Sequence, residues 1–383
     1  MPNFFQKVGQ DCQGCNPCLD AGVRGCRPRL NKESCYEKNH NIVNRFCCHD
    51  FFVGCSQGKN TGAIPTENTP KTETLDIFAM DTYMNIKYFA NENTDCSQKL
   101  KSKIEYLENI FSVTNANSDI SKINSNAGKF TAVSGDTTML VKKETEISDM
   151  TEGCLEITVY SILKEWGFTT GNYKIPEQTT LNDLLKNTGY QNIALEDNKI
   201  KIPQNFAVDL GAVAKGYTGD KLCDIFRKEN VKSALINLGG NVQTLGTKPD
   251  GSLWNVALKN PIDTEKEVCV VSLSDKAMIT SGGYERYFIG KDGKQYWHIL
   301  DPKTGYPSDK GLLSVTIIGK DGTLCDALST ALFVMGEEKA KTFAITHNEV
   351  DVILINSNME IFITENLKNY IKMLDNFRYQ IIA

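Results

Sequence analysis

The 383-residue sequence has no excess of basic residues, because 42 Lys and Arg stand against 47 Asp and Glu, a net charge of −5 at pH 7. Sequence-independent binding to nucleic acid usually needs a basic surface, so we exclude that class of partner. No apolar stretch approaches the roughly 20 residues of a membrane span. The first fifteen residues also lack the basic start and the apolar run of about seven residues typical of a secretory signal. We therefore expect a cytoplasmic protein that has no membrane span and acts on small molecules or proteins.

Cysteine is sparse after residue 60, whereas eight of the thirteen cysteines precede it. The segment between the two regions is rich in Thr, Pro and Asn, which is typical of a flexible linker. We predict a Cys-rich module over 1–60, a linker over 61–74 and one large domain over 75–383.

The Cys-rich module has the spacing Cys12-x2-Cys15-x2-Cys18, which lets one turn of chain present three sulfurs to a metal. In a reducing compartment we expect metal–thiolate bonds, and both zinc and an iron–sulfur cluster fit. Export would favour four disulfides instead, and free thiols are the third alternative. The five later cysteines show no ligand spacing, so we interpret them as small buried apolar residues.

The region from residue 75 onward alternates strand-like and helix-like segments, which predicts a mixed α and β fold. Alternating apolar residues predict a strand over 76–90, and helical spacing predicts a helix over 96–111. Further helices are expected over 139–149 and 154–166. Val, Ile and Leu runs predict strands over 231–238, 253–258, 268–273, 313–318 and 350–355.

Five Gly- and Asp-bearing segments fall between residues 209 and 332. They are DLGAVAKGY, NLGGN, SGGYERYF, WHILDPKTGYP and DALSTAL. Glycine lets backbone N–H groups approach phosphate oxygens, so the segments together indicate a site for a phosphorylated ligand. Each segment alone is also consistent with an ordinary turn.

Two of these segments suggest charged ligands at helices. Asp209 is a candidate helix cap, and Lys215 would follow in the first turn, where its charge opposes the helix dipole unless an anion is bound. Asp326 and Thr330 are four residues apart on a predicted helix, so a carboxylate and a hydroxyl share one face and suit magnesium. The structural alternatives are an exposed lysine and an N-cap at Asp326.

Two other segments supply acid–base and donor groups. His298 can exchange protons near neutral pH, and Asp301 follows it in a turn rich in Pro and Gly. A buried structural imidazole is the alternative for His298. Ser281 and Gly282 are candidate donors to a phosphate or flavin, with a tight turn as their alternative.

The sequence resembles the ApbE-type FAD:protein FMN transferases over residues 75–383. The resemblance rests on MDTYMNIKY at 80–88, SDISKIN at 118–124, ITVYSILKEWGF at 157–168 and the five later segments, in the family's order. It implies an α+β flavin transferase domain, preceded here by the Cys-rich module. It also implies that magnesium-bound FAD is cleaved and FMN passes to a Thr or Ser of an acceptor flavoprotein, with release of AMP.

The resemblance also assigns roles to individual residues. Asp326, Thr330 and the carbonyl of Ala212 would hold magnesium, and His298, supported by Asp301, would deprotonate the acceptor hydroxyl. The positions matching the FAD site are Met80, Thr114, Leu155, Glu156, Thr158, Asp209 and Lys215, and Ser281 and Gly282 join them as donors. The chain departs from the family pattern at Glu156, where Asp is usual, and at Ser161, where Pro is usual.

Two alternatives to the transferase remain at this point. A flavin-binding protein could store FAD or hydrolyse it to FMN and AMP without an acceptor. The chain could also receive FMN itself, since TAVSGDTTML at 131–140 partly matches the family's acceptor pattern D-x-x-(S/T)-G-A-T. It has Thr131 for Asp and Asp136 for Ala, so we expect a loop there and an acceptor in another protein.

Overall fold

The computed structural model describes residues 70–91 and 94–382, so the predicted metal ligands Cys12, Cys15 and Cys18 lie outside the described residues. The predicted strand over 76–90 is in fact part of a hairpin of β1 (Lys71–Ala79) and β2 (Thr82–Ala90). Met80 and Asp81 form its turn, with φ of 50° and 58°. The prediction missed this turn because it lacks glycine, the usual residue at such angles.

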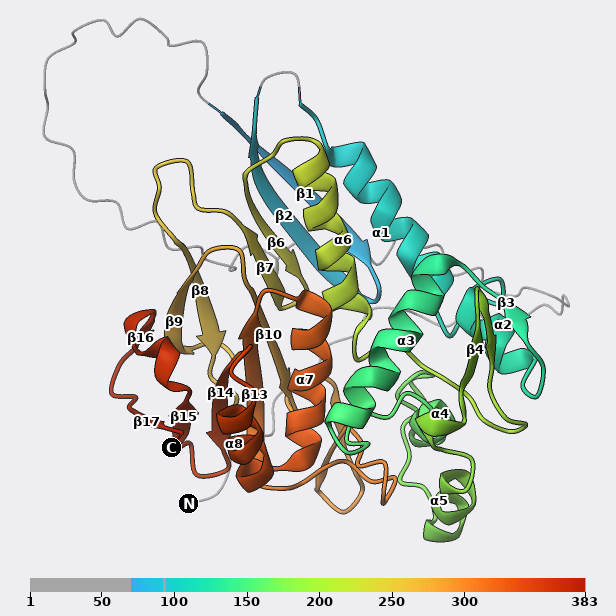
Figure 1. Cartoon of the computed structure of the whole chain (residues 1–383). Helices are drawn as coiled ribbons and strands as arrows, with labels where there is room; N and C mark the ends of the chain where they lie inside the picture. Colours follow the sequence, from blue (N-terminus) through green and yellow to red (C-terminus); the bar gives the residue numbers. More distant parts are fainter. Residues whose placement is uncertain (1–69, 92–93, 383) are drawn as a thin grey trace, which may run out of the picture. The chain divides into compact units, whose positions relative to one another are not determined.

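A nine-stranded sheet runs through the domain in the order β1-β2-β6-β7-β10-β13-β14-β15-β17 (Figure 1). Its neighbours are antiparallel except for β15 and β17. The remaining strands of the sheet are β6 (Ser233–Leu238), β7 (Asn241–Leu245), β10 (Ala277–Gly282), β13 (Leu312–Gly319), β14 (Asp351–Asn356), β15 (Ile361–Ile363) and β17 (Tyr379–Ile381). The strands predicted over 231–238, 313–318 and 350–355 are thereby confirmed.

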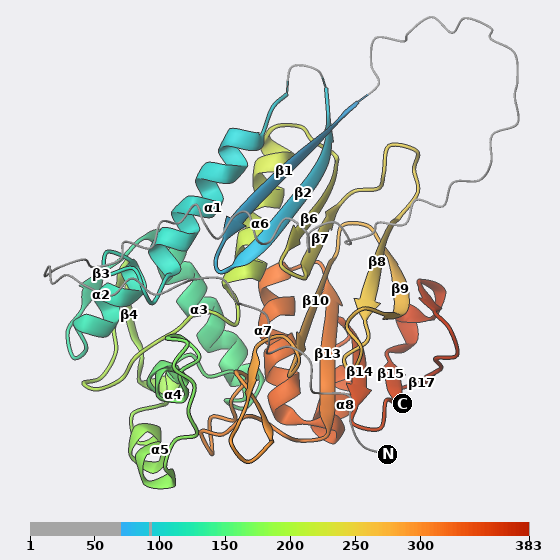
Figure 2. The same cartoon turned by 180° about the vertical axis from the view of Figure 1, so that it is seen from behind.

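The helices that cover one face of this sheet are α1 (Ser97–Phe111), α6 (Ala214–Lys228), α7 (Gly322–Met335) and α8 (Glu337–Thr346), as the views from the two sides show (Figures 1 and 2). Helix α3 (Gly135–Met150) packs on α7, and α2 (Asp119–Ser125), α4 (Tyr160–Trp166) and α5 (Gln178–Leu185) lie beside the sheet. The predicted helix over 96–111 is confirmed. The helix predicted over 154–166 begins only at Tyr160, since residues 154–159 form turns.

Alternation in the central strands explains why both faces of the sheet are buried there. In β14, Val352 and Leu354 join the core beneath the helices, whereas Ile353 and Ile355 face the other side. That side is covered by a small sheet of β8 (Trp254–Lys259), β9 (Glu267–Leu273) and β16 (Ile371–Met373). The strands predicted over 253–258 and 268–273 are thus confirmed as its members.

Three short strands, β3 (Thr131–Ala132), β4 (Ala194–Glu196) and β5 (Lys199–Lys201), form another small sheet. In the sequence, β3 precedes α3, whereas β4 and β5 follow it. The prediction of a loop at TAVSGDTTML is therefore wrong, because this segment contains β3 and the beginning of α3. Ser134 is the N-cap of α3, and its side chain accepts a hydrogen bond from the Thr137 N–H. Thr137 is fully buried.

A two-stranded sheet, β11 (Tyr287–Ile289) and β12 (Gln295–Trp297), stands apart from the main sheet. The chain between β10 and β13 that contains it, orange in Figure 1, lies between the foot of α7 and helix α5. Phe288 and Tyr296 of this hairpin pack against Trp166 of α4. The Trp166 indole N–H donates to the Gly305 carbonyl at 2.7 Å, which joins α4 to the turn after the hairpin.

The cysteines of the described region are free, and four of the five are buried, as predicted; Cys154 is half-buried. Burial raises the pKa of Cys223 and of Cys269 to about 12, so both thiols stay protonated. No helix in the described ranges has the length and apolar character to span a bilayer.

Candidate active site

The contact between α6 and α7 forms the innermost part of the candidate site. The backbone N–H of Gly216 on α6 donates to Oδ2 of Asp326 on α7 at 2.8 Å. A Cβ at position 216 would lie 2.3 Å from the Gly322 carbonyl oxygen and 2.7 Å from the Asp326 Cβ. Glycine is therefore required for these helices to approach, and its role here is packing rather than approach to a phosphate.

Asp326 lies one turn inside α7 and is 4% exposed. The N-cap of this helix is Asp321, whose side chain accepts from the Leu324 N–H, so the structural alternative that Asp326 caps the helix is wrong. One turn further, the Thr330 hydroxyl lies 3.2 Å from the Ser281 hydroxyl of β10. A carboxylate and two hydroxyls are thus presented by adjoining positions of α7 and β10.

Ser281 and Gly282 both lie in β10 and pair with β13. The Ser281 side chain, rather than a loop backbone, faces α7. Gly282 is buried, and a Cβ there would lie 2.4 Å from the Tyr284 ring. The NLGGN segment is a turn between β6 and β7, in which Gly239 and Gly240 have φ of 64° and 98°. Ordinary turn and packing roles therefore account for these glycines.

Lys215 lies in the first turn of α6, as predicted. Its positive charge lowers the pKa of Asp326, Asp209 and His298. Burial raises the pKa of Asp326 and of Asp209, and the Lys215 ammonium opposes both shifts. Asp209 does not cap the helix; its Oδ1 accepts from the Gly211 N–H at 2.8 Å, and Val213 is the N-cap. The described site thus combines the buried carboxylate of Asp326 and the half-buried carboxylate of Asp209 with one lysine.

His298 follows β12 directly and is held by Arg286, which precedes β11. Its N–H donates to the Arg286 carbonyl at 3.1 Å, and ring Nδ1 lies 3.2 Å from the same oxygen. A carbonyl only accepts, so Nδ1 carries the proton and a neutral ring has its lone pair at Nε2. Burial, aided by the positive charges of Arg286 and Lys215, lowers the pKa of His298 to about 4. The imidazole is therefore neutral at pH 7.

Asp301 organises the turn that follows His298. Its Oδ2 pairs with the Lys310 ammonium at 2.7 Å, and its Oδ1 accepts from the Lys303 N–H at 2.9 Å. Its carbonyl accepts from the Gly305 N–H at 2.8 Å. These contacts fix the turn rather than the imidazole, so Asp301 supports His298 through the backbone.

Glu156 and Thr158 hold the loop before α4 in place. Glu156 Oε1 accepts from the Thr158 N–H and hydroxyl at 2.9 and 2.7 Å, and Oε2 accepts from the Tyr190 N–H at 3.0 Å. This loop meets the segment before α6, because the Asp209 N–H donates to the Ile157 carbonyl at 2.9 Å. The longer Glu is therefore used fully within the protein, and neighbouring Leu155 is a core residue.

Met80 and Thr114 lie at loop positions of the domain. Met80 is in the β1–β2 turn, where its N–H donates to Glu108 Oε1 at 2.8 Å and its sulfur lies 3.7 Å from the Thr218 hydroxyl of α6. Thr114 is exposed after α1 and lies 3.1 Å from the Ser112 hydroxyl. Met80 is thus tied to the central helix pair, whereas the hydrogen bonds of Thr114 are to neighbouring residues of its own loop.

Sequence reasoning missed two charged residues near the site, Arg286 and Glu144. Arg286 belongs to the SGGYERYF segment, and the selection of that segment as a candidate phosphate or flavin site could have drawn attention to its one arginine. Glu144 is fully buried on α3, and neither carboxyl oxygen has a hydrogen-bond partner in the described structure. Burial, reinforced by the negative charges of Asp209, Asp326 and Glu156, raises its pKa well above the usual range. Nothing in its helical spacing distinguished it from an exposed glutamate.

The oxygen atoms that this site offers a cation come from one carboxylate together with hydroxyl and carbonyl groups, not from a cluster of carboxylates. Among the residues the structure describes, no group of three or more His, Cys, Asp or Glu could hold a metal. Ala212 lies in the turn that leads into α6, four residues before Gly216. A single carboxylate with hydroxyl and carbonyl oxygens suits magnesium, which keeps several water or phosphate ligands.

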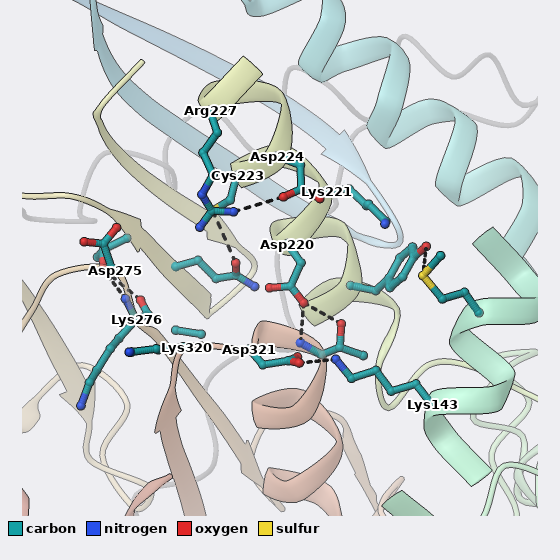
Figure 3. Close-up of a pocket in the computed structure, with 16 residues that line it drawn as sticks. Lys143, Asp220, Lys221, Cys223, Asp224, Arg227, Asp275, Lys276, Lys320 and Asp321 are labelled. Carbon is teal, nitrogen blue, oxygen red and sulfur yellow. Dashed lines mark hydrogen bonds and ion pairs between the residues drawn. The ribbon is translucent and has the colours of Figure 1, made fainter. Parts of the chain in front are cut away.

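A separate pocket of about 340 Å³ lies beside the start of α7 (Figure 3). None of the predicted flavin or magnesium residues lines it. Its acids are already engaged: Asp220 accepts from the Gly322 and Thr323 N–H groups, and Asp321 pairs with Lys143. We interpret this pocket as part of the packing between α6 and α7, not as a second active site.

Comparisons with known proteins identify similar sequences. The family model described as "ApbE family" matches residues 80–354. The FAD:protein FMN transferase of Klebsiella pneumoniae is 32% identical over 73% of this chain and 87% of its own length. That of Vibrio cholerae is also 32% identical, over 72% and 85%.

Solved structures show the same fold. The ApbE protein of Thermotoga maritima has a TM-score of 0.74 and 30% identity, covering 78% of this chain and 99% of its own. The flavin transferase ApbE of Vibrio cholerae has a TM-score of 0.71 and 28% identity, covering 79% and 99%.

Proposed function

The chain belongs to the ApbE family, and from this premise we propose that it transfers FMN from FAD to a Thr or Ser hydroxyl of an acceptor protein, releasing AMP. The observation that carries the proposal is the α6–α7 contact, where buried Asp326 lies beside hydroxyl donors and within the field of Lys215. The relatives' names supply the reaction class, and the residues of this chain supply the groups such a reaction requires.

Magnesium would be held by Asp326, Thr330 and the carbonyl of Ala212. The donor set fits, because these are hard oxygens and the buried Asp326 carboxylate is balanced only partly by Lys215. A bound magnesium ion would neutralise charge on the pyrophosphate and on the departing AMP.

Lys215 and Arg286 would bind the pyrophosphate of FAD. Both carry positive charge into the same region, since both act on the pKa of Asp209 and of His298. The negative charge of a pyrophosphate would offset the repulsion between the two cations. The attraction between these cations and the phosphate oxygens would be stronger in the transition state of phosphoryl transfer, where charge builds up on those oxygens.

His298 would deprotonate the acceptor hydroxyl through Nε2, because Nδ1–H is committed to the Arg286 carbonyl. The acceptor oxygen then bonds to the FMN phosphorus, the bond from that phosphorus to the bridging oxygen breaks, and AMP leaves with that oxygen. The acceptor's proton passes to His298. Asp301 would position the turn that carries the imidazole.

Met80, Asp209 and the loop of Leu155, Glu156 and Thr158 would form the walls around the flavin, with Thr114 and Gly282 at the periphery. The support is the backbone bond between Asp209 and Ile157, which joins this loop to the start of α6. The metal of the Cys-rich module stays a prediction.

Intact mass spectrometry tests the proposal. A peptide carrying a D-x-x-(S/T)-G-A-T pattern is incubated with the full chain, FAD and magnesium, and we expect the peptide to gain one FMN while AMP appears. Release of FMN and AMP without a gain of mass on the peptide would instead identify a pyrophosphatase. A gain of FMN on the protein itself would indicate that Ser134 or another hydroxyl of the chain is the acceptor.

A further inference from the structure

The outer edge of β11 is unpaired within the described residues, because β11 and β12 form a sheet of two strands. Exposed edges are commonly protected by charge or proline. β1, at the edge of the main sheet, follows that rule with Lys71, Glu73 and Asp76, whereas β11 consists of Tyr287, Phe288 and Ile289 alone. The β11 edge has neither a charged residue nor a proline, so its shortness is the one such protection that its own residues supply against pairing with another strand.

The register of the hairpin determines which backbone groups point outward. The His298 N–H donates to the Arg286 carbonyl, and the Gly290 N–H donates to the Lys294 carbonyl. Hydrogen-bonded pairs alternate along an antiparallel ladder, so Phe288 also bonds inward to β12. Tyr287 and Ile289 lie between these pairs and therefore direct their N–H and C=O groups to the free edge.

The side chains follow a matching division. Phe288 packs within the aromatic cluster, stacked on Tyr173 and Tyr296. Tyr287 and Ile289 are 46% and 58% exposed, although both are large and apolar. Their exposed side chains add apolar contact to the outward backbone groups.

The position of His298 indicates what binds there. It is the residue after β12, and it pairs with the residue before β11. A chain paired with Tyr287 and Ile289 would lie two strand spacings, about 10 Å, from β12, so its next residues would have to cross over Arg286 to reach the imidazole. An extended segment of a protein substrate has this shape, whereas FAD has no backbone to complete a sheet.

We propose that the acceptor protein docks as a third strand on the outer edge of β11, pairing with Tyr287 and Ile289. Its hydroxyl residue follows the paired segment and lies at His298. This inference rests on the proposed transferase function, and it adds the surface that recognises the second substrate.

Ile289→Pro is the discriminating variant. It removes an outward N–H and retains the ladder bonds to β12, so the hairpin is preserved. With the acceptor-pattern peptide as probe and saturating FAD and magnesium, we expect the KM for the peptide to rise about tenfold, which corresponds to about 1.4 kcal/mol. The Kd for FAD and the kcat at saturating peptide should be unchanged. Tyr287→Asp serves as a second variant, and Ile345→Asp, at a 55% exposed position of α8, is the matched control.

Hydrogen exchange supplies a readout independent of activity. Peptide binding should slow exchange of the Tyr287 and Ile289 amides about tenfold and leave the Phe288 amide, already bonded to β12, as the internal reference. Suppose that the parent transfers FMN, that peptide binding leaves exchange of the Tyr287 and Ile289 amides unchanged, and that both variants keep the parental KM. This result would overturn docking at β11 but not the proposed function. Absence of transfer by the parent would overturn the proposed function and this inference together.

Discussion

The α6–α7 contact and the β11–β12 hairpin supply the two principal groups of the site, and they are held in different ways. Asp326 lies in a buried helix pair whose spacing leaves no room for a Cβ at Gly216. His298 lies at the end of a two-stranded sheet with exposed side chains. Under the proposed function, the charged ligand would meet closely packed helices inside the core, whereas the imidazole is carried by a peripheral hairpin that a second substrate could approach.

Replacing the carboxylate of the closely packed helices should have the largest effect. Asp326→Asn keeps the shape but removes the charge for magnesium, and we expect FMN transfer to fall about 1000-fold. Quantified FMN gain by mass spectrometry measures it. Asp321→Asn on the same helix is the control, because Asn also caps helices, and it should retain activity. Equal loss in both variants would mean that α7 as a whole, rather than the carboxylate, matters.

Replacing the imidazole tests the peripheral element. His298→Gln should lower transfer about 100-fold, the lower range for loss of a general base. The base form of His298 exists above its pKa of about 4, so the parental rate should fall as the pH approaches that value. The residual rate of the variant should lack this acid limb, and His347→Gln should match the parent. An identical acid limb in His298→Gln would assign it to another group.

Forcing α6 and α7 apart tests how much their close packing contributes to the free energy of unfolding. Gly216→Ala forces a Cβ against backbone atoms, and overpacking of this kind costs about 1–3 kcal/mol. Denaturant unfolding measures the loss. Gly135→Ala, at the first residue of α3, is the control, since its Cβ would meet only the Asn198 side-chain oxygen at 4.0 Å, and stability should not fall. Equal losses would contradict the tight α6–α7 contact.

The smallest effect concerns the unpartnered acid of α3. The folded-state pKa of Glu144 is raised, so the stability that its protonated form contributes is present below about pH 4.5 and is lost as the pH rises toward the folded pKa. Glu144→Gln removes that loss and should stabilise the protein by about 1 kcal/mol at pH 7, a gain that fades near pH 4.5. Thermal unfolding at both pH values measures it. Exposed Glu146→Gln should show neither effect, and destabilisation of Glu144→Gln at pH 7 would indicate that the carboxylate is bound to a cation.

Local patterns predicted the helices and strands with strong periodicity, and the spacing of Asp326 and Thr330 correctly placed both on one helix. The β1–β2 turn was missed because Met80 and Asp81 adopt left-handed angles that tertiary contacts stabilise. The loop over 154–159 looked helical because its apolar residues serve the core. Arg286 and Glu144 could not be ranked, since their importance depends on which residues distant in sequence surround them.

The aromatic cluster around Trp166 has a spectroscopic consequence. The chain has three tryptophans. Trp166 packs on the β11–β12 hairpin, Trp297 belongs to it, and Trp254 lies on β8 of another sheet. A Trp254→Phe variant would confine tryptophan fluorescence to the neighbourhood of His298. The tryptophan emission of that variant would then report, without any label, changes around the hairpin when an acceptor is added.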